Sequence, residues 1–549
     1  MNFIINIFKT ASLSSKKSFV LIFSTLFVSL LDVLGLGLFF GLLNVLFSDS
    51  DHVIIEYLFV FDFINQNNVD FYAIVFFAII FSIRSITILS LHLYIIKLSK
   101  TIQKELRNYV AKYYINGKFN KYFNNNLEEL SNDFTINVNK FSNHLFQPLL
   151  MMISDVMIVS FIVILLVLQN LILFLILFSV LAIFGSLFII YVKPIQKRSG
   201  HLHLQSSKKI LMFANELYFG AKQILILNKT QLFLKRISKA SDGIINSEVK
   251  NQFFSKLPRY SLEIIIVLLI SVFLIFTIDI ENRNELFLDV SLFMIAFMRL
   301  APSLTSFFQN FGKVEFGKDA NEVISNIKNT VDKNKKLSKT LNSPISFEKV
   351  VIDSLNFSYD NKNKIFNNLS FTINKGDKVA IVGPSGSGKS TLISLLLGFI
   401  ESEDILIDNK QLKKINQKWL NSLAYISQNS FILSTSIKNN ITLLEENADP
   451  ELFETSLRLS NLKDFYENRA NEQNISTNLS GGEAQRIEIA RAVYSNRKIL
   501  FLDEVTSALD SKNEKEIFNL VTSFPKEYTI FMITHSEKYL THFDKIIKI

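Results

Sequence analysis

Long apolar stretches separated by polar connections dominate the first part of the chain. A hydrocarbon core about 30 Å thick needs roughly 20 apolar residues in one helix. Stretches of that length predict membrane-spanning helices at approximately 19–47, 71–98, 147–168, 171–192, 258–279 and 286–311. The pattern therefore predicts a six-span helical membrane domain.

Charges in the connections predict how these spans are oriented. The segment 48–70 holds five Asp or Glu and no Lys or Arg, whereas 97–121 holds seven Lys or Arg and 193–258 holds twelve. Because cytoplasmic connections are enriched in Lys and Arg, we predict that both basic connections and the N-terminus are cytoplasmic. We expect an inner (plasma) membrane location, with helical arms that reach from the spans toward a soluble partner.

Composition supports a chain of two parts. Its 49% hydrophobic content and 52 Phe are typical of a membrane protein, and the absence of Cys excludes disulfides. The net charge of +9 comes largely from segments beside the spans, so we expect membrane lipids and no nucleic acid as partners. We predict a membrane domain at 1–312, a Lys- and Asn-rich linker at 313–342 and a soluble α/β domain at 343–549.

The strongest chemical signal is KVAIVGPSGSGKST, residues 378–391. It predicts a strand, a glycine-rich loop and a helix start, which is the context of a phosphate-binding loop. Backbone amides there can surround the phosphates of ATP, Lys389 adds a positive charge, and the Ser390 hydroxyl ligates Mg²⁺. The predicted ATP-binding residues are Gly383, Pro384, Ser385, Gly386, Ser387, Gly388, Lys389, Ser390 and Thr391.

A second signal, KILFLDEVTSALD, is an apolar strand that ends in Asp503 and Glu504. Asp503 is placed to hold Mg²⁺, and Glu504 to act as the general base for an attacking water. A structural acidic strand end is the alternative, and the phosphate-binding loop argues against it. These two motifs predict ATP hydrolysis.

A third motif, NLSGGEAQRIEIARA (478–492), places Ser480, Gly481 and Gly482 at a helix start, which makes a second phosphate-binding cradle. One ATP cannot easily occupy both cradles of one chain. Here the sequence resembles the ABC transporter family, in which this signature motif completes the ATP site of the opposite subunit. Six spans before one ATPase domain resemble the exporter branch (type IV fold), as a half-transporter. The resemblance implies a homodimer, with an α/β P-loop ABC ATPase domain after the spans.

The resemblance also assigns residues outside these motifs. Tyr359 in NFSYD resembles the aromatic residue that stacks on adenine, and Gln428 in AYISQNS resembles the glutamine that contacts Mg²⁺ and the attacking water. His535 in MITHS matches the histidine that contacts the γ-phosphate, and Asp510 ends a loop, SALD, that crosses the dimer interface. The implied catalytic residues are Glu504, His535 and Gln428, and the implied Mg²⁺ ligands are Ser390, Gln428 and Asp503.

The arms hold two segments, 124–134 and 218–230, that resemble the family's coupling segments, although ordinary amphipathic helix surface is the alternative. The chain departs from the family pattern at 469–478, which lacks the usual glycines before the signature motif.

Ionisable residues inside the predicted spans need a partner or a polar cavity, because they cost about 2.5–3.5 kcal/mol on insertion scales. The chain has Asp32, Arg84, Asp155, Glu263 and Arg299 in spans, and Arg259 at the inner end of the fifth. Pairing inside the bundle, for example Asp32 with Arg84, is one interpretation. The other is that Arg84, Arg259 and Arg299 bind an anionic cargo, because guanidinium groups bind phosphate in a bidentate manner.

The stretches around these arginines resemble bacterial flippases that move lipid-linked oligosaccharides for protein N-glycosylation. The Phe-rich segment 52–66 resembles the short external helix of those flippases, although an interfacial helix without a cargo role has the same composition. The resemblance implies ATP-driven flipping or export of a polyprenyl-pyrophosphate glycan. Export of lipid A-type lipids, peptides or drugs is one alternative, and an ATP-gated regulatory membrane module is another.

Overall fold

The computed structural model of the protein describes residues 2–11, 14–47, 69–115, 127–169, 171–277, 283–335, 345–359, 364–475, 479–507 and 509–549. The predicted external helix at 52–66 lies outside these residues. The chain divides into two compact units, one helical and one containing all the described strands.

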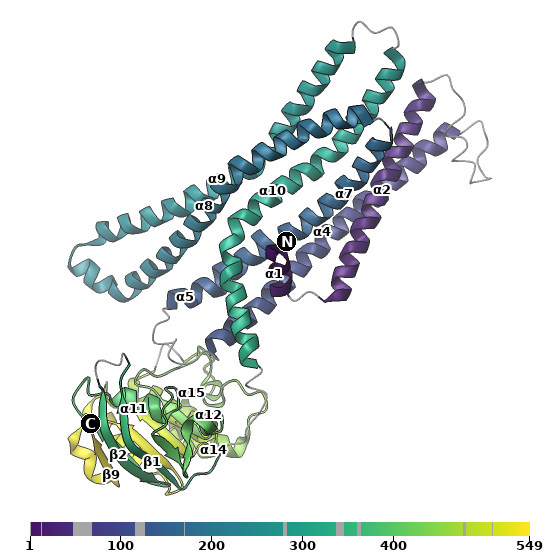
Figure 1. Ribbon diagram of the computed structural model, residues 1–549. Helices are drawn as coiled ribbons and strands as arrows, with labels where there is room; N and C mark the ends of the chain where they lie inside the picture. Colours follow the sequence, from purple (N-terminus) through teal and green to yellow (C-terminus); the bar gives the residue numbers. More distant parts are fainter. Residues whose placement is uncertain are drawn as a thin grey trace. The chain divides into compact units, whose positions relative to one another are not determined.

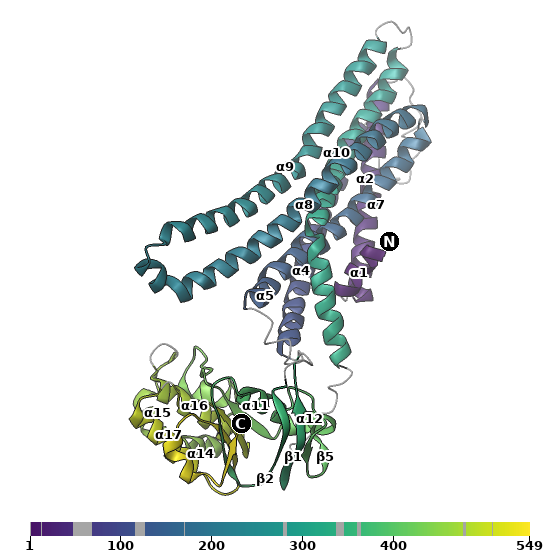
Figure 2. The ribbon, with the colours of Figure 1, turned by 60° about the vertical axis from the view of Figure 1, so that its left-hand side comes forward.

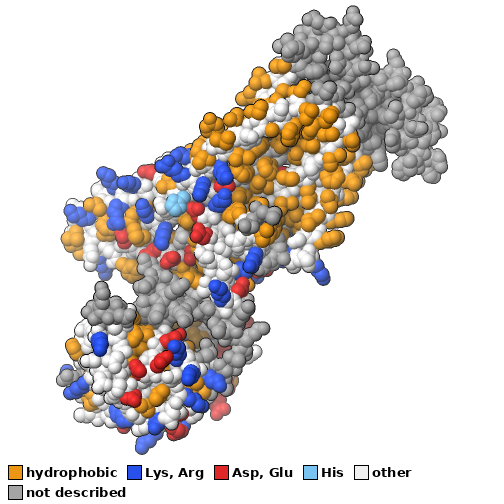
Figure 3. All heavy atoms as spheres, viewed as in Figure 1, with side chains coloured by type: hydrophobic (Ala, Val, Ile, Leu, Met, Phe, Trp, Pro, Cys, Tyr) orange, Lys and Arg blue, Asp and Glu red, His pale blue; other side chains and the backbone are white. Residues whose placement is uncertain are grey.

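Six long helices form most of the helical unit (Figure 1), and each predicted span falls on one of them. Their bounds are α2 Ser15–Phe47, α4 Val69–Ile115, α7 Gln147–Gln169, α8 Leu171–Ile226, α9 Thr230–Thr277 and α10 Arg283–Lys335. Within the described residues, four helices are long and apolar enough to cross a membrane: Ser15–Gly35, Phe77–Ile115, Glu128–Leu168 and Phe174–Ile226. Figure 3 shows hydrophobic side chains over the middle of this unit and Lys and Arg over the α8–α9 hairpin, in agreement with the predicted spans and arms.

Helices α8 and α9 form a long hairpin whose far end stands apart from the other helices of the unit (Figures 1 and 2). Asn228, in the turn just after α8, has a left-handed φ of 52°, a conformation that Asn tolerates better than most residues. Large apolar side chains near this tip are exposed, including Tyr218 at 82% and Phe219 at 80%. The tip therefore carries large apolar side chains that lack packing among the described residues of one chain.

Shorter helices complete the unit. They are α1 Asn2–Ala11, α5 Leu127–Ser131, η3 Asn132–Asn137, α6 Val138–Lys140 and η4 Phe141–Phe146. The C-terminal end of α1 is capped by Lys328 of α10, whose Nζ donates to the carbonyls of Lys9 and Thr10 at 2.8 Å each. Cations at a helix C-terminus satisfy its free carbonyls, so Lys328 attaches α1 to α10.

In the first part of the segment 313–342, which the sequence analysis assigned to a linker, α10 continues as a helix to Lys335. Its apolar residues repeat at helical spacing and are buried; they are Val314, Phe316, Ala320, Ile324, Ile327 and Val331. Several of them pack in one core with residues of α1, α4 and η4. The linker prediction rested on the Lys and Asn content of this segment and did not use the helical spacing of its apolar residues.

The second unit contains two β-sheets. The antiparallel sheet has the order β2-β1-β4-β5, and the parallel sheet has the order β6-β7-β8-β3-β9. The antiparallel strands are β1 Lys349–Phe357, β2 Phe366–Asn374, β4 Ile405–Ile407 and β5 Lys410–Gln411. The parallel strands are β3 Lys378–Val382, β6 Leu423–Ile426, β7 Ile499–Asp503, β8 Thr529–Ile533 and β9 Lys545–Lys548.

Helices cover these sheets around two cores. Their bounds are α11 Lys389–Leu396, α12 Leu412–Leu420, α13 Ile437–Thr442, α14 Pro450–Leu459, α15 Lys463–Arg469, α16 Gly481–Tyr494, α17 Ser511–Ser523 and η5 Glu537–His542. Helices α13 to α16 share a third, separate core that includes Ile437, Leu457 and Ile487. The predicted fold class, spans followed by an α/β P-loop domain, is confirmed.

Candidate ATP site at the ends of the parallel strands

The parallel sheet brings the predicted catalytic segments together. Strands β6, β7, β8 and β3 are neighbours, and their carboxyl ends lead to Gln428, Asp503–Glu504, His535 and the loop 383–388. Ligands of open α/β sheets bind at this edge. Segments more than 100 residues apart in the sequence therefore meet at one edge of the sheet.

The loop between β3 and α11 has the shape of a phosphate cradle. Gly386 and Gly388 have φ values of 82° and 101°, which favour glycine, and a Cβ at Gly388 would lie 2.6 Å from Ile365. Lys389 is buried, and its Nζ donates to the carbonyls of Gly383 at 3.0 Å and Pro384 at 2.9 Å. The Ser387 hydroxyl is buried without a partner among the described residues. These donors fit the phosphates of ATP.

The predicted catalytic residues contact one another. The Glu504 carboxylate lies 3.0 Å from His535 Nε2 through one oxygen and accepts from Gln428 Nε2 at 3.1 Å through the other. Gln428 Nε2 also lies 3.3 Å from the Ser507 hydroxyl. Glu504 itself has a φ of 50°, a left-handed conformation that non-glycine residues adopt rarely and mostly at functional sites. A carboxylate held in this way can accept a proton from a water beside it.

Asp503 lies in a setting that suits a divalent cation. Burial raises the pKa of its carboxyl; the hydrogen bond from Tyr425 and the charge of Lys389 oppose the rise, and the charge of Glu504 adds to it. A bound Mg²⁺ supplies the positive charge that favours the ionised carboxylate. Tyr425, whose hydroxyl donates to Asp503 Oδ2 at 2.9 Å, was missed in the sequence. The available signal was its position on β6, beside β7, three residues before Gln428.

The signature segment begins α16. Ser480 is the N-cap; its hydroxyl accepts from the Glu483 amide at 3.3 Å, and the Glu483 carboxylate accepts from the Ser480 amide at 2.7 Å. This capping box satisfies two free amides at the start of α16. Among the described contacts, none joins Ser480, Gly481 or Gly482 to the loop 383–391.

Two further predicted residues lie near these elements. Tyr359 is 63% exposed, its ring packs against Phe357, and its hydroxyl lies 3.5 Å from the Thr391 hydroxyl on α11. Asp510 is the N-cap residue of α17, where Asn513 donates to its carboxylate. An exposed aromatic ring beside the phosphate loop is available for stacking.

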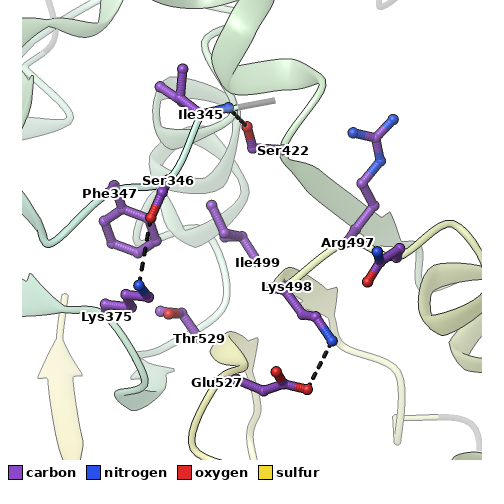
Figure 4. Close-up of a pocket in the computed structure, with 11 residues that line it drawn as sticks. Ile345, Ser346, Phe347, Lys375, Ser422, Arg497, Lys498, Ile499, Glu527 and Thr529 are labelled. Atoms are coloured by element: carbon purple, nitrogen blue, oxygen red, sulfur yellow. Dashed lines mark hydrogen bonds and ion pairs between the residues drawn. The ribbon is translucent and has the colours of Figure 1, made fainter. Parts of the chain in front are cut away.

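The pocket in Figure 4 is a different feature of the same unit. It is lined by residues at the amino ends of the parallel strands, such as Lys498, Ile499 and Thr529, and Lys498 there pairs with Glu527 at 2.8 Å. None of the predicted site residues lines it. The candidate ATP site lies at the opposite, carboxyl edge of the sheet.

In the helical unit, the predicted arginines fall into two places. Arg84 Nε donates to Asp32 Oδ1 at 2.8 Å, as the pairing interpretation predicted, and the Arg299 guanidinium lies 3.7 Å from the centre of the Phe81 ring. The Arg84 guanidinium lies 6.0 Å from that same ring. Two guanidinium groups and one carboxylate therefore gather around Phe81 from α2, α4 and α10.

Arg259 is not joined to this group by any described contact. It pairs with Glu263 one turn along α9 at 3.2 Å, and the two side chains are 66% and 55% exposed. Asp155 is buried and accepts from the Ser306 hydroxyl at 2.6 Å.

Comparison with known proteins identifies the family. The family model of the ABC transporter transmembrane region matches residues 18–301, more than half of the chain, and the family model described as ABC transporter matches residues 366–507. The chain belongs to the ABC transporter family, as its motifs predicted, and it carries an ABC ATPase domain.

Curated relatives match only part of the chain. ABC transporter B family member 13 of Arabidopsis thaliana is 40% identical over 212 residues, which are 37% of this chain and 17% of that protein. A Bacillus subtilis protein provisionally named as a multidrug export ATP-binding/permease protein is 35% identical over 209 residues, 36% of each chain. The aligned part thus spans about a sixth to a third of the curated relatives.

The fold also matches a solved structure over nearly its full length. A bacterial Atm1-family ABC exporter solved with ATP bound has a TM-score of 0.73, and the match covers 98% of this chain and 94% of that one. At 19% sequence identity, this likeness establishes the fold alone.

Proposed function

We propose that two copies of the chain form an inner-membrane exporter that hydrolyses ATP to flip or export a lipid-linked, pyrophosphate-bearing oligosaccharide. The observation that carries ATP hydrolysis is the meeting of Glu504, His535 and Gln428 beside the Lys389 loop. The ATPase domain and the N-terminus would lie in the cytoplasm, as the basic arms predict.

The roles of the ATPase residues follow from their chemistry. Lys389 and the amides of 383–391 would hold the phosphates of ATP, Tyr359 the adenine, and Ser390, Gln428 and Asp503 the Mg²⁺, which neutralises phosphate charge. Glu504 accepts a proton from the attacking water, and His535 fixes one oxygen of that carboxylate.

A homodimer is supported by the signature segment, which one chain does not bring into contact with its own phosphate loop among the described residues. Ser480 and the two glycines after it form a helix N-terminus that is suited to phosphate, without contact to the chain's own phosphate loop among the described residues. We propose that they complete the ATP site of a second copy, with Asp510 at the interface. We propose that the exposed apolar tip of the α8–α9 hairpin, around Tyr218 and Phe219, is the surface that couples the membrane helices to ATP hydrolysis.

An anionic cargo is supported by the arginines of the membrane helices. Asp32 neutralises one charge beside Phe81, which leaves a net positive charge from Arg84 and Arg299. A pyrophosphate group can accept from guanidinium groups even while Arg84 keeps one contact to Asp32, because each guanidinium carries five N–H donors. Arg259, exposed on α9, is the third proposed contact.

Two alternatives have their own support. The name of the B. subtilis relative favours export of drug-like molecules by the same ATP chemistry. An ATP-gated regulatory membrane module, which transports nothing, would use the same ATPase domain.

Reconstitution in liposomes separates these functions. We expect ATP-dependent flipping of a fluorescent undecaprenyl-pyrophosphate glycan, lost in Arg299→Ala while basal ATP hydrolysis remains. Brisk hydrolysis with export of a drug-like dye and no flipping would contradict the glycan proposal. Hydrolysis that moves neither probe, nor a lipid A-type lipid, would favour the regulatory module.

A further inference from the structure

Helix α16 holds both backbone polar groups of one loop residue, Phe431. Glu488 Oε1 accepts from the Phe431 amide at 2.7 Å, and Arg491 Nη2 donates to the Phe431 carbonyl at 3.0 Å. Arg491 Nε also donates to the Asn440 carbonyl at 2.9 Å. Glu488 and Arg491 lie one turn apart on α16, so they form a rigid two-point attachment.

Burying the Glu488 carboxylate at this position costs free energy. Glu488 is 6% exposed. Burial raises the pKa of this carboxyl, and the Phe431 amide, the Arg491 charge, the Ser430 side chain and the Ser427 backbone oppose the rise. Neither the helix nor the core requires a carboxylate at this position, since its neighbours Ile487 and Ile489 supply the apolar packing of α16. Its contribution is its bonding to the loop 427–431, chiefly to the Phe431 amide, beside an ion pair with Arg491 at 3.9 Å.

Phe431 belongs to the loop that carries Gln428. Three residues before Phe431, the Gln428 side chain contacts Glu504 at 3.1 Å. At its other end, α16 begins directly after Ser480, the N-cap. Ser480 is therefore linked to Glu504 in three steps. Helix α16 joins Ser480 to Glu488, Glu488 bonds to Phe431, and the loop that contains Phe431 carries Gln428, which contacts Glu504.

We propose that Glu488 is a positioning residue that transmits movement of the signature helix to Gln428. When a second copy's ATP engages the Ser480 end, α16 shifts as one body and Glu488 carries the loop 427–431 with it. Gln428 then holds the Glu504 carboxylate in its working position. This role rests on the proposed composite ATP site and deepens it, because it links engagement of Ser480 to the base in the same chain.

Steady-state ATP hydrolysis by the full-length chain in liposomes tests the proposal. Glu488→Ala should lower kcat by up to about 100-fold, the size of effect expected when a catalytic group is misplaced by an ångström, with the KM for ATP unchanged. Glu488→Gln should restore most of the rate, because its amide oxygen still accepts from the Phe431 amide. Glu516→Ala is the matched control: it removes a carboxylate that contacts α16 through Arg486 at 2.9 Å but does not contact the loop.

Hydrogen exchange gives a readout that does not depend on hydrolysis. Glu488→Ala should speed exchange of the Phe431 amide without nucleotide. With Mg-ATP, it should leave protection at 480–484 intact while abolishing the protection that the wild type gains at 427–431. Equal kcat losses in Glu488→Ala and Glu516→Ala, failure of Glu488→Gln to recover, or unchanged exchange at Phe431 would each overturn the proposal. A wild type that hydrolyses no ATP would instead overturn the proposed function, and the Phe431 exchange would still report on the link.

Discussion

Glu504 is fixed by contacts at both oxygens of its carboxylate. Gln428 donates to one oxygen, His535 lies at the other, and the backbone of Glu504 takes a left-handed φ of 50°. A strained backbone of this kind costs about 1–3 kcal/mol and persists where the surrounding structure holds it. The parallel strands β7 and β8 supply that support, because they place Asp503 opposite Ile533, two residues before His535.

Glu504→Gln should lower ATP hydrolysis by about 10²–10⁴-fold, because an amide cannot accept the proton that a general base accepts. ATP binding should persist, since Lys389 and the phosphate loop are unchanged. Parallel measurements of hydrolysis and nucleotide binding check this. Glu527→Gln is the control at the opposite edge of the sheet, where it breaks only an exposed ion pair with Lys498 worth up to about 1 kcal/mol. Hydrolysis that survives Glu504→Gln would rule out Glu504 as the base.

The Asp32–Arg84 pair separates a structural role from a cargo role. Arg84→Ala leaves the buried Asp32 carboxylate without its partner, which should destabilise the chain by about 3–5 kcal/mol. The double variant Asp32→Asn with Arg84→Gln removes both charges and should recover most of that loss. If Arg84 also binds the cargo, the double variant folds but does not flip the glycan. Thermal unfolding and flipping, measured on the same preparations, distinguish the two roles; full transport by the double variant would exclude the cargo role.

At the scale of elements, α8 and α10 approach closely at Gly200. A Cβ there would lie 2.1 Å from the Phe316 carbonyl oxygen, which is a backbone atom and cannot move independently. Lys140 strengthens the same crossing, because its Nζ donates to the Gly200 carbonyl at 2.7 Å and lies 4.6 Å from the centre of the Phe316 ring. The crossing therefore requires glycine at this position.

Gly200→Ala should lower the free energy of unfolding by about 1–3 kcal/mol or more, because the two helices must separate. Gly35→Ala is the matched control, since that buried helical glycine has room for a Cβ, with the nearest atom 3.9 Å away on Phe81. Its effect should be small, and thermal unfolding of the two variants in the same lipid checks the difference. Equal stability of both variants would contradict the close crossing.

The sequence predicted those elements whose signals are local. The glycine spacing of 383–391 and the acidic end of β7 define their chemistry within a few residues, and the structure places both at the carboxyl edge of the parallel sheet. The continuation of α10 to Lys335 was missed because its apolar period is masked by Lys and Asn. Tyr425 and Glu488 were missed because their partners, Asp503 and Phe431, lie 78 and 57 residues away, and only the fold brings them together.

At the scale of the whole molecule, each of the two units has a surface for which the described part of one chain supplies no binding partner. Ser480 presents a capped helix N-terminus that no described contact joins to the chain's own phosphate loop, and Tyr218 and Phe219 expose apolar rings at the hairpin tip. Exposed apolar groups of this size favour a protein contact. A second copy would complete both features, and each ATP site would then combine Lys389 of one chain with Ser480 of the other.

Mixed dimers test this arrangement directly. Lys389→Ala and Ser480→Arg should each abolish hydrolysis in homodimers, because every composite site then carries one defect. A dimer purified through two different tags, with Lys389→Ala on one chain and Ser480→Arg on the other, has both defects in one site and none in the other, so hydrolysis should return. The control dimer carries both substitutions on one chain beside a wild-type chain. It has a defect in each composite site and should stay inactive. If each ATP site were instead contained within a single chain, the control dimer would be active through its wild-type chain and the first mixed dimer would be inactive.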